Sequence, residues 1–204
     1  MTSQNIPEMI DMVFDLEGGI LPASHTFALW DALLHIAPEL DANRQVGVLQ
    51  LRTSANGTNV FLAKRAKLTI RIPKAVAQQA AAKLTGRQLT LAGTPLNLGS
   101  SKMRELQAFP TLHAHLVTGN EDEVIFIEGI QQQLRGFGIS ANLICGKRSA
   151  ISDGSSTIRG YSLVVHDLKP DASVLLQSAG LGTHRQFGCG IFIPYKVITG
   201  LSED

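Results

Sequence analysis

The sequence predicts an α+β protein with two tandem ferredoxin-like domains, each a split β-α-β unit of the kind that RRM domains share. Strand and helix patterns follow one another in the order β-α-β-β-α-β, and that order is repeated in the second half of the chain. The 204 residues suit two domains of about 100 residues each. We therefore expect an N-terminal domain at 1–98, a linker at 99–110 and a C-terminal domain at 111–204.

The first half begins with a β-prone run at 9–18, which two glycines end. A helix is expected at 24–37, because Ser24 is a suitable N-cap and Pro38 cannot continue a helix. The apolar residues of this helix recur at helical spacing: Phe27, Trp30, Leu33 and Leu34.

Two strands, at 45–52 and 59–73, are expected on either side of the turn at 54–57. A second helix follows, with Pro73 in its first turn and Gly86 just after its end. Its predicted apolar face comprises Val76, Ala77, Ala80, Ala81 and Leu84. A strand or hairpin at 87–99 completes the first half.

The second half repeats this order. Strands are expected at 111–117, 139–151, 157–168 and 188–198, with the turn Ser152-Asp153-Gly154-Ser155 between the middle two. The helix at 122–138 has an acidic start that complements its dipole, and the helix at 170–180 begins with proline and ends with glycine. Four residues of the longer helix are expected to face inward: Ile127, Ile130, Leu134 and Phe137.

Charge is distributed unevenly along a chain whose net charge is only +1. Residues 1–43 carry seven carboxylates and no lysine or arginine, whereas residues 42–104 carry eleven basic residues and no carboxylate. Such an uneven charge distribution favours a polyanionic partner, although charged residues on solvated faces would give the same numbers of acidic and basic residues.

Composition excludes several classes of protein. No apolar run approaches the roughly 18 residues of a membrane span, and the N-terminus has no signal-peptide pattern. Cys145 and Cys189 are far apart, so we expect no disulfide framework and a cytoplasmic location. The pair His113 and His115 has no carboxylate or cysteine beside it, which argues for a structural or surface role over a metal site.

Glycines cluster near the C-terminus in "GLGTHRQFGCGIFIPYK", residues 180–196. Glycine allows close backbone approach to a phosphate, and His184, Arg185 and Lys196 add basic or titratable side chains. No Walker-type or dinucleotide-binding fingerprint is present, so a nucleotide-binding regulator is a weaker interpretation than a phosphodiester-binding protein.

These residues carry a resemblance. The segment, preceded by "GYSLVVHDLKPDASVLLQSAGLG", resembles the glycine-rich signature of CRISPR-associated precursor-RNA endoribonucleases of the RAMP superfamily. The resemblance extends through "GISANLICGKRS", "LAGTPLNLGSSKMRELQAFPTLHAHLV" and "FDLEGGILPASHTFAL", and so covers nearly the whole chain. It implies tandem ferredoxin-like domains and metal-independent cleavage of CRISPR repeat RNA, with the mature guide RNA in many members kept in an effector complex with other subunits.

The chemistry of RNA is compatible with that implication. The 2′-hydroxyl supplies the nucleophile, so the protein needs a base, an acid and cations, and no cofactor or metal. Histidine titrates in the right range for either proton. The resemblance favours His25, at the start of the first helix, as the catalytic histidine; His35 is the second choice and His184 the third.

The expected RNA-binding residues are basic side chains and glycines of the two domains. They are Lys64, Arg65, Lys67, Arg71, Lys147, Arg148, Gly182, His184, Arg185, Gly188, Gly190 and Lys196. Alternation along the predicted strand at 59–73 puts Arg65, Lys67 and Arg71 on one face, expected to be open. Lys64, Arg65, Tyr161 and Lys196 are also candidates for assisting His25.

Few aromatic residues argue against the base-stacking platform of an RRM, whose RNP motifs are also missing. An RNA-binding RAMP subunit that packages guide RNA without cutting it is the alternative function. It needs no well-placed histidine, so His25 weighs against it.

Overall fold

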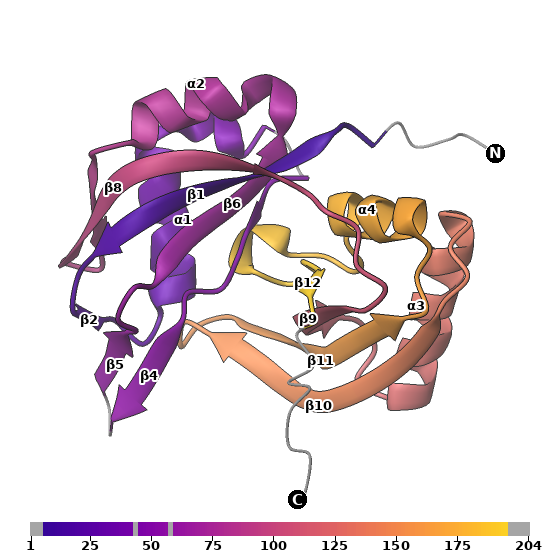
Figure 1. Ribbon diagram of the computed structural model, residues 1–204. Coiled ribbons are helices and arrows are strands. Elements are labelled where there is room, and N and C mark those ends of the chain that lie inside the picture. Colours follow the sequence, from indigo (N-terminus) through magenta and orange to yellow (C-terminus); the bar gives the residue numbers. More distant parts are fainter. Residues whose placement is uncertain (1–5, 43–44, 57–58, 196–204) are drawn as a thin grey trace, which may run out of the picture.

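Two β-sheets lie beside each other, each with helices on one face (Figure 1). The structure is a computed structural model and describes residues 6–42, 45–56 and 59–195. No helix in these ranges is long and apolar enough to cross a membrane.

The first sheet has the strand order β3-β6-β1-β8-β7, with antiparallel neighbours throughout. Its strands are β1 (Met9–Glu17), β3 (Gly47–Val48), β6 (Lys67–Pro73), β7 (Gln88–Leu91) and β8 (Thr94–Glu105). The helices α1 (His25–Ile36) and α2 (Lys74–Leu84) pack their buried residues into one apolar core with this sheet. Val76 is exposed, contrary to expectation, whereas the other four residues predicted on the face of α2 are buried.

The second sheet has the order β10-β11-β9-β12. Its strands are β9 (Leu112–Thr118), β10 (Asn142–Ser152), β11 (Thr157–His166) and β12 (Ile193–Pro194). Its core includes buried residues of α3 (Glu123–Gly136) and α4 (Pro170–Ala179). In α3, Phe126 is fully buried beside Ile130 and Leu134, while Ile127 and Phe137 are only partly buried.

A third, small sheet departs from the sequence prediction. It contains β2 (Ile20–Leu21), β5 (Asn59–Leu62) and β4 (Thr53–Asn56) in the order β2-β5-β4. The predicted strand at 59–73 is therefore two strands, β5 and β6, separated by a turn in which Arg65 has a φ of 64°. The predicted strand at 45–52 is reduced to β3, and β4 follows it.

Strand β8 also extends farther than expected, since it continues to Glu105 along β1. Residues 99–105 therefore belong to the first sheet, and the connection between the sheets is shorter than the predicted linker at 99–110. Two short 3₁₀ helices complete the structure, η1 (Pro38–Leu40) and η2 (Arg185–Phe187).

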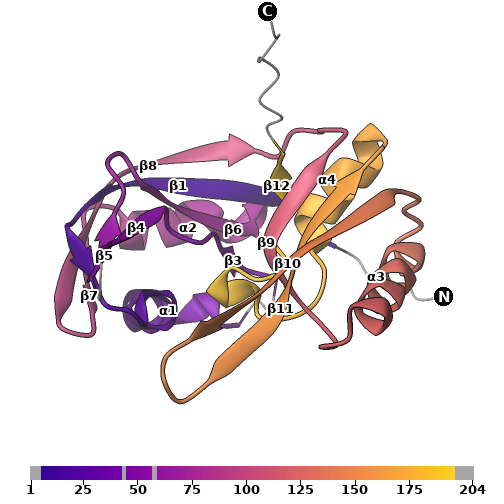
Figure 2. The same ribbon diagram turned by 90° about the horizontal axis from the view of Figure 1, so that it is seen from below.

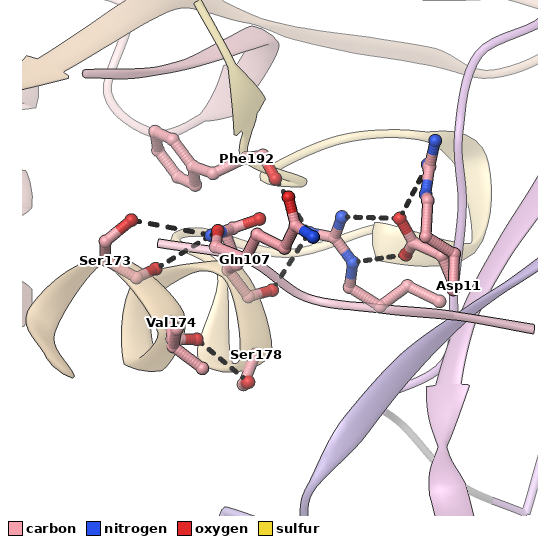
Figure 3. A network of polar contacts seen from close by, with 9 residues as sticks. Asp11, Gln107, Ser173, Val174, Ser178 and Phe192 are labelled. Atoms are coloured by element: carbon pink, nitrogen blue, oxygen red, sulfur yellow. Dashed lines mark hydrogen bonds and ion pairs between the residues drawn. The ribbon is translucent and has the colours of Figure 1, made fainter. Parts of the chain in front are cut away.

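Arg71 joins the two halves of the molecule. Its guanidinium donates to both carboxylate oxygens of Asp11, at 2.8 and 3.2 Å. It also donates to two carbonyls of the second half, those of Gln177 at 3.1 Å and Phe192 at 2.7 Å (Figure 3). The expectation that Arg71 lies on an open face is wrong, because the second half covers that face and leaves its side chain 1% exposed.

The connecting segment is held to the same junction. The side chain of Gln177 donates to the carbonyl of Gln107 at 2.8 Å (Figure 3). The Phe109 amide donates to the Ser173 hydroxyl at 2.9 Å. Buried polar groups thus have partners across the junction, which fixes how the two sheets are oriented.

Candidate functional site

His25 is the first residue of α1 and follows directly on the turn after β2. Its Nδ1 lies 3.1 Å from the carbonyl oxygen of Pro22. A carbonyl can only accept a hydrogen bond, so Nδ1 carries the proton in the neutral ring. The lone pair is then on Nε2, which is the arrangement a general base requires.

The surroundings of His25 favour its neutral form. Burial is the largest influence and lowers the pKa of the imidazole, while the carbonyls of Pro22 and Ala23 oppose part of that change. The ring is therefore mainly neutral near pH 7.

The N-terminus of α1 suits an anion. Ser24 occupies the N-cap position but makes no side-chain capping bond, and the first turn has no acidic residue. The amides of His25 and Phe27 donate to the Pro22 and Ser24 carbonyls, both at 3.0 Å, so it is the positive end of the helix dipole that attracts negative charge, such as a phosphate.

The glycine-rich segment packs against the same helix. The Phe187 ring lies 4.6 Å from the Phe27 ring of α1, and the His184 ring is stacked on Phe187 at 6.4 Å. His184 is exposed and has a left-handed backbone, with φ 66°. This packing ties the third histidine candidate to α1, the helix that begins with His25.

The glycines of this segment are close to protein backbone. At Gly190, which has φ 65°, a Cβ would overlap the carbonyl of Leu181. At Gly188, which has φ 82°, it would lie 3.1 Å from the carbonyl of Val48. Both glycines are buried, so tight packing within the protein accounts for them, and of the candidate glycines Gly182 is the exposed one.

Arg185 is also buried, contrary to a surface role. Its Nη1 donates to the carbonyl of Ala179, and its Nε and Nη2 have no partner among the described residues. Burial, with the neighbouring charge of Arg71, lowers the pKa of the Arg185 guanidinium to about 10, so it stays charged at neutral pH.

Other basic candidates are exposed, and they differ in their partners. Lys64 and Arg65 lie in the turn after β5, which pairs with the β2 strand that leads to His25. Lys67, at the start of β6, forms an ion pair with Asp15. Arg65 does not share a strand face with Lys67 and Arg71 as expected, because it lies in the turn at Ala63–Ala66. Lys67 and Arg71 are four residues apart on β6 and do lie on one face.

The hairpin of β10 and β11 extends toward α1 in both ribbon views (Figures 1 and 2). Asp153, in its turn, helps to line a groove of about 630 Å³ with Asp31 and His35 of α1. Lys147 and Arg148 are exposed on β10, and Arg148 is paired with Glu121. His35 thus lies in this groove, in the last turn of α1, while His25 begins the helix.

Two of the four expected helper residues do not lie on the described surface of the site. Tyr161 is buried, and its hydroxyl donates to the carbonyl of Glu121 at 2.6 Å, which gives it a structural role. Lys196 lies outside the described residues.

Sequence reasoning missed some neighbours of the site. Arg52, which precedes β4, was not among the expected residues, although its charge acts on His115. The nearness of Phe27 to Phe187 has no signal in the sequence, since the two are far apart in the chain. In the described ranges, no group of three or more histidine, cysteine, aspartate or glutamate side chains is placed to hold a metal ion.

Solved structures with this arrangement of sheets and helices include a CRISPR-associated protein and a RAMP protein. A structure of a CRISPR-associated Cas6 protein matches with a TM-score of 0.63 at 11% identity, covering 93% of this chain and 100% of the other. A RAMP protein described as binding different RNA substrates matches with a TM-score of 0.65 at 12% identity, covering 90% and 98%.

Sequence comparison identifies the family within that class. The Cas6 CRISPR family model matches residues 10–197. The CRISPR-associated endonuclease Cas6 of Myxococcus xanthus is 31% identical over 193 residues, which cover 93% of this chain and 83% of the relative. The chain belongs to the Cas6 family of CRISPR-associated endoribonucleases.

Proposed function

We propose that this protein cuts the repeat RNA of CRISPR precursor transcripts without a metal ion, by attack of the RNA's own 2′-hydroxyl. The observation that carries the proposal is the His25 imidazole, whose Nδ1 is committed to Pro22 at the uncapped N-terminus of α1. The name of the Myxococcus xanthus relative supports nuclease activity. A Thermus thermophilus Cse3 structure of similar fold, at a TM-score of 0.51 and 11% identity over 91% of this chain and 98% of the other, is described as bound to an RNA representing a pre-cleavage complex.

The two halves of the chain share one strand order, which supports the proposed function. When the four principal strands of each half are numbered along the chain, they lie side by side in the sheet in the order second, third, first, fourth. These orders are β3-β6-β1-β8 in the first half and β10-β11-β9-β12 in the second. We interpret both halves as ferredoxin-like domains on this basis. RNA-binding proteins of the RRM type use the same arrangement.

In the proposed reaction, His25 Nε2 removes the proton from the 2′-hydroxyl of the nucleotide immediately upstream of the scissile phosphate. The 2′-oxygen forms a bond to phosphorus and the bond to the 5′-oxygen breaks, which leaves a 2′,3′-cyclic phosphate and a 5′-hydroxyl. The leaving oxygen takes a proton from a general acid, a role we assign to the exposed His184. The positive end of the α1 dipole stabilises the charge on the phosphorane.

The cationic part of the site is the turn with Lys64 and Arg65. Pairing of β5 with β2 brings this turn to the segment that precedes α1, since the Leu62 amide donates to the Gly19 carbonyl at 2.9 Å. Two exposed positive charges beside Gly19, in the segment that leads through β2 to His25, suit a phosphodiester backbone. The function further implies a cytoplasmic enzyme that passes its product to, or keeps it in, a CRISPR effector complex.

The proposal is tested with a labelled repeat RNA in excess EDTA. We expect wild-type protein to cut it and to leave a cyclic phosphate on the upstream fragment. A matched RNA with 2′-deoxyribose before the cut should bind equally well and remain intact. Normal cleavage of the deoxy RNA would exclude 2′-hydroxyl attack, and loss of cleavage in EDTA would exclude the metal-independent reaction. RNA binding without any cleavage would instead favour a guide-packaging subunit.

A further inference from the structure

Strand β9 presents two histidines on the face of the second sheet that is turned away from its helices. Leu112 and Ala114 are fully buried in the core that α3 and α4 cover. His113 and His115 alternate with them, so their side chains lie on the opposite face. His113 is partly buried and His115 is exposed.

The neighbouring strands continue this surface. Ile193 of β12 and Val164 of β11 are the partners of His113, and Ile144 of β10 is the partner of Val164. Residues directly opposite each other in antiparallel strands share a face. Ile144 is 55% exposed, so this side of the sheet is open at β10.

Three rings gather there. The His113 ring lies 4.6 Å from that of His115, edge to face, and 5.8 Å from that of Tyr195. Tyr195, which follows β12, is 48% exposed. We call the surface formed by His113, His115, Val164, Ile193, Tyr195 and Ile144 the open histidine face.

Positive charge borders the open histidine face. Burial and the nearby Arg52 both lower the pKa of His115, and burial lowers that of His113. Arg52 is exposed, and its carbonyl accepts from the Ala63 amide at 2.9 Å, next to the turn of Lys64 and Arg65. The face is thus continuous, through Arg52, with the basic turn of the proposed active site.

We propose that the open histidine face binds an unpaired stretch of RNA beside the cleaved repeat, with bases on His113 and Tyr195 and a phosphate at Arg52. The inference rests on the proposed function, because it requires repeat RNA at the active site. Exposed rings beside a cation suit single-stranded RNA, since every base has a π-face that can stack. The rings belong to histidine and tyrosine outside any RNP motif, which is why composition gave no indication of them.

The test compares two labelled RNAs, a repeat stem-loop alone and the same stem-loop with an unpaired flank. Binding is titrated with wild type, the double variant His113→Ala/Tyr195→Ala and the single variant His113→Phe. We expect the flank to tighten wild-type binding and the double variant to bind the flanked RNA about ten- to a hundredfold more weakly, as the removal of base stacking predicts. Its affinity for the stem-loop should stay unchanged, and His113→Phe, which keeps a stacking ring, should resemble wild type.

Three results with the double variant would overturn the inference. One is a double variant that binds the flanked RNA as tightly as wild type does. Another is an equal loss of affinity for both RNAs, which would indicate a structural role. The third is a change of oligomeric state in the double variant with unchanged RNA affinity, which would assign the face to a protein contact. If wild type bound neither RNA, the proposed function itself would fail. If wild type bound both RNAs equally well, only the role of the open histidine face in RNA binding would be excluded.

Discussion

The hydrogen bond from His25 to the Pro22 carbonyl decides which ring nitrogen can act. With Nδ1 committed to the backbone at 3.1 Å, Nε2 is the nitrogen left to exchange a proton with RNA. Burial lowers the pKa of the ring, so at neutral pH it is ready to act as a base. A hydrogen bond to the protein backbone thereby specifies the role of the side chain.

This environment predicts the pH dependence of cleavage. Because a general base must be neutral, the rate should fall as the pH drops through the lowered pKa of His25, with a midpoint below the ordinary histidine value of about 6.5. The measurement is the cleavage rate constant at subsaturating protein concentration, which reports the free enzyme. A rate profile with no falling limb on the acidic side, below the ordinary histidine value of about 6.5, would contradict the base role.

For single residues, sequence reasoning selected His25 but could not tell that two arginines, Arg71 and Arg185, would be buried while neighbouring basic side chains stay exposed. Alternation along a strand distinguishes two faces and does not reveal which face another part of the chain will cover. Arg71 and Arg185 are both covered at the junction of the two halves, whereas Lys64 and Arg65 remain exposed. Burial of a charge by a distant segment has no local signal.

Among the elements, the small sheet of β2, β5 and β4 was the least predictable. Its strands are short, and the unbroken basic and apolar pattern of 59–73 conceals the turn at Arg65. The helices were predicted closely because capping and stop signals are local: α1, expected at 24–37, spans His25–Ile36. The glycine cluster was expected to approach a phosphate, but the groups that approach Gly188 and Gly190 belong to the protein.

The basic turn should contribute electrostatically to RNA binding. We expect the double variant Lys64→Ala/Arg65→Ala to weaken binding of all RNAs. The slope of log affinity against log salt should become shallower by about one for each phosphate that the variant no longer neutralises. Binding titrations at several salt concentrations give the slope.

Lys169→Ala is the matched control for that experiment. Lys169 is an exposed lysine at the N-cap of α4, at the opposite end of the molecule from β4 and β5 in both ribbon views (Figures 1 and 2). The substitution removes one positive charge without touching the proposed site, so its slope should match wild type. Equal slopes for the double variant, Lys169→Ala and wild type would remove the basic turn from the RNA interface.

For the whole molecule, the junction at Arg71 makes the two halves one structural unit. A single guanidinium contacts Asp11 of β1, the last turn of α4 and the approach to β12. Arg104 also donates to Asp11, at 3.0 Å. The sequence predicted two domains and contained no sign of how they would be joined, since Arg71 is 106 and 121 residues from its partners in the second half.

Loss of the Arg71 guanidinium should therefore destabilise the protein strongly. Arg71→Met leaves the buried Asp11 carboxylate with a partner only in Arg104 and removes a donor from two carbonyls, so we expect the free energy of unfolding to fall by about 3 kcal/mol. Urea denaturation measures it. Lys67→Met, which removes an exposed ion pair from the same strand, should stay near wild type. A similarly small change for Arg71→Met would show that the junction contributes little to stability.

The central claim is that His25 transfers the proton that starts metal-independent cleavage. It is tested most directly by single-turnover cleavage of labelled repeat RNA in EDTA, at saturating protein, for wild type, His25→Ala and His35→Ala. The account predicts a rate about 10²- to 10⁴-fold lower for His25→Ala with RNA affinity little changed, and a rate near wild type for His35→Ala. A His25→Ala rate near wild type, or an equivalent loss confined to His35→Ala, would contradict it.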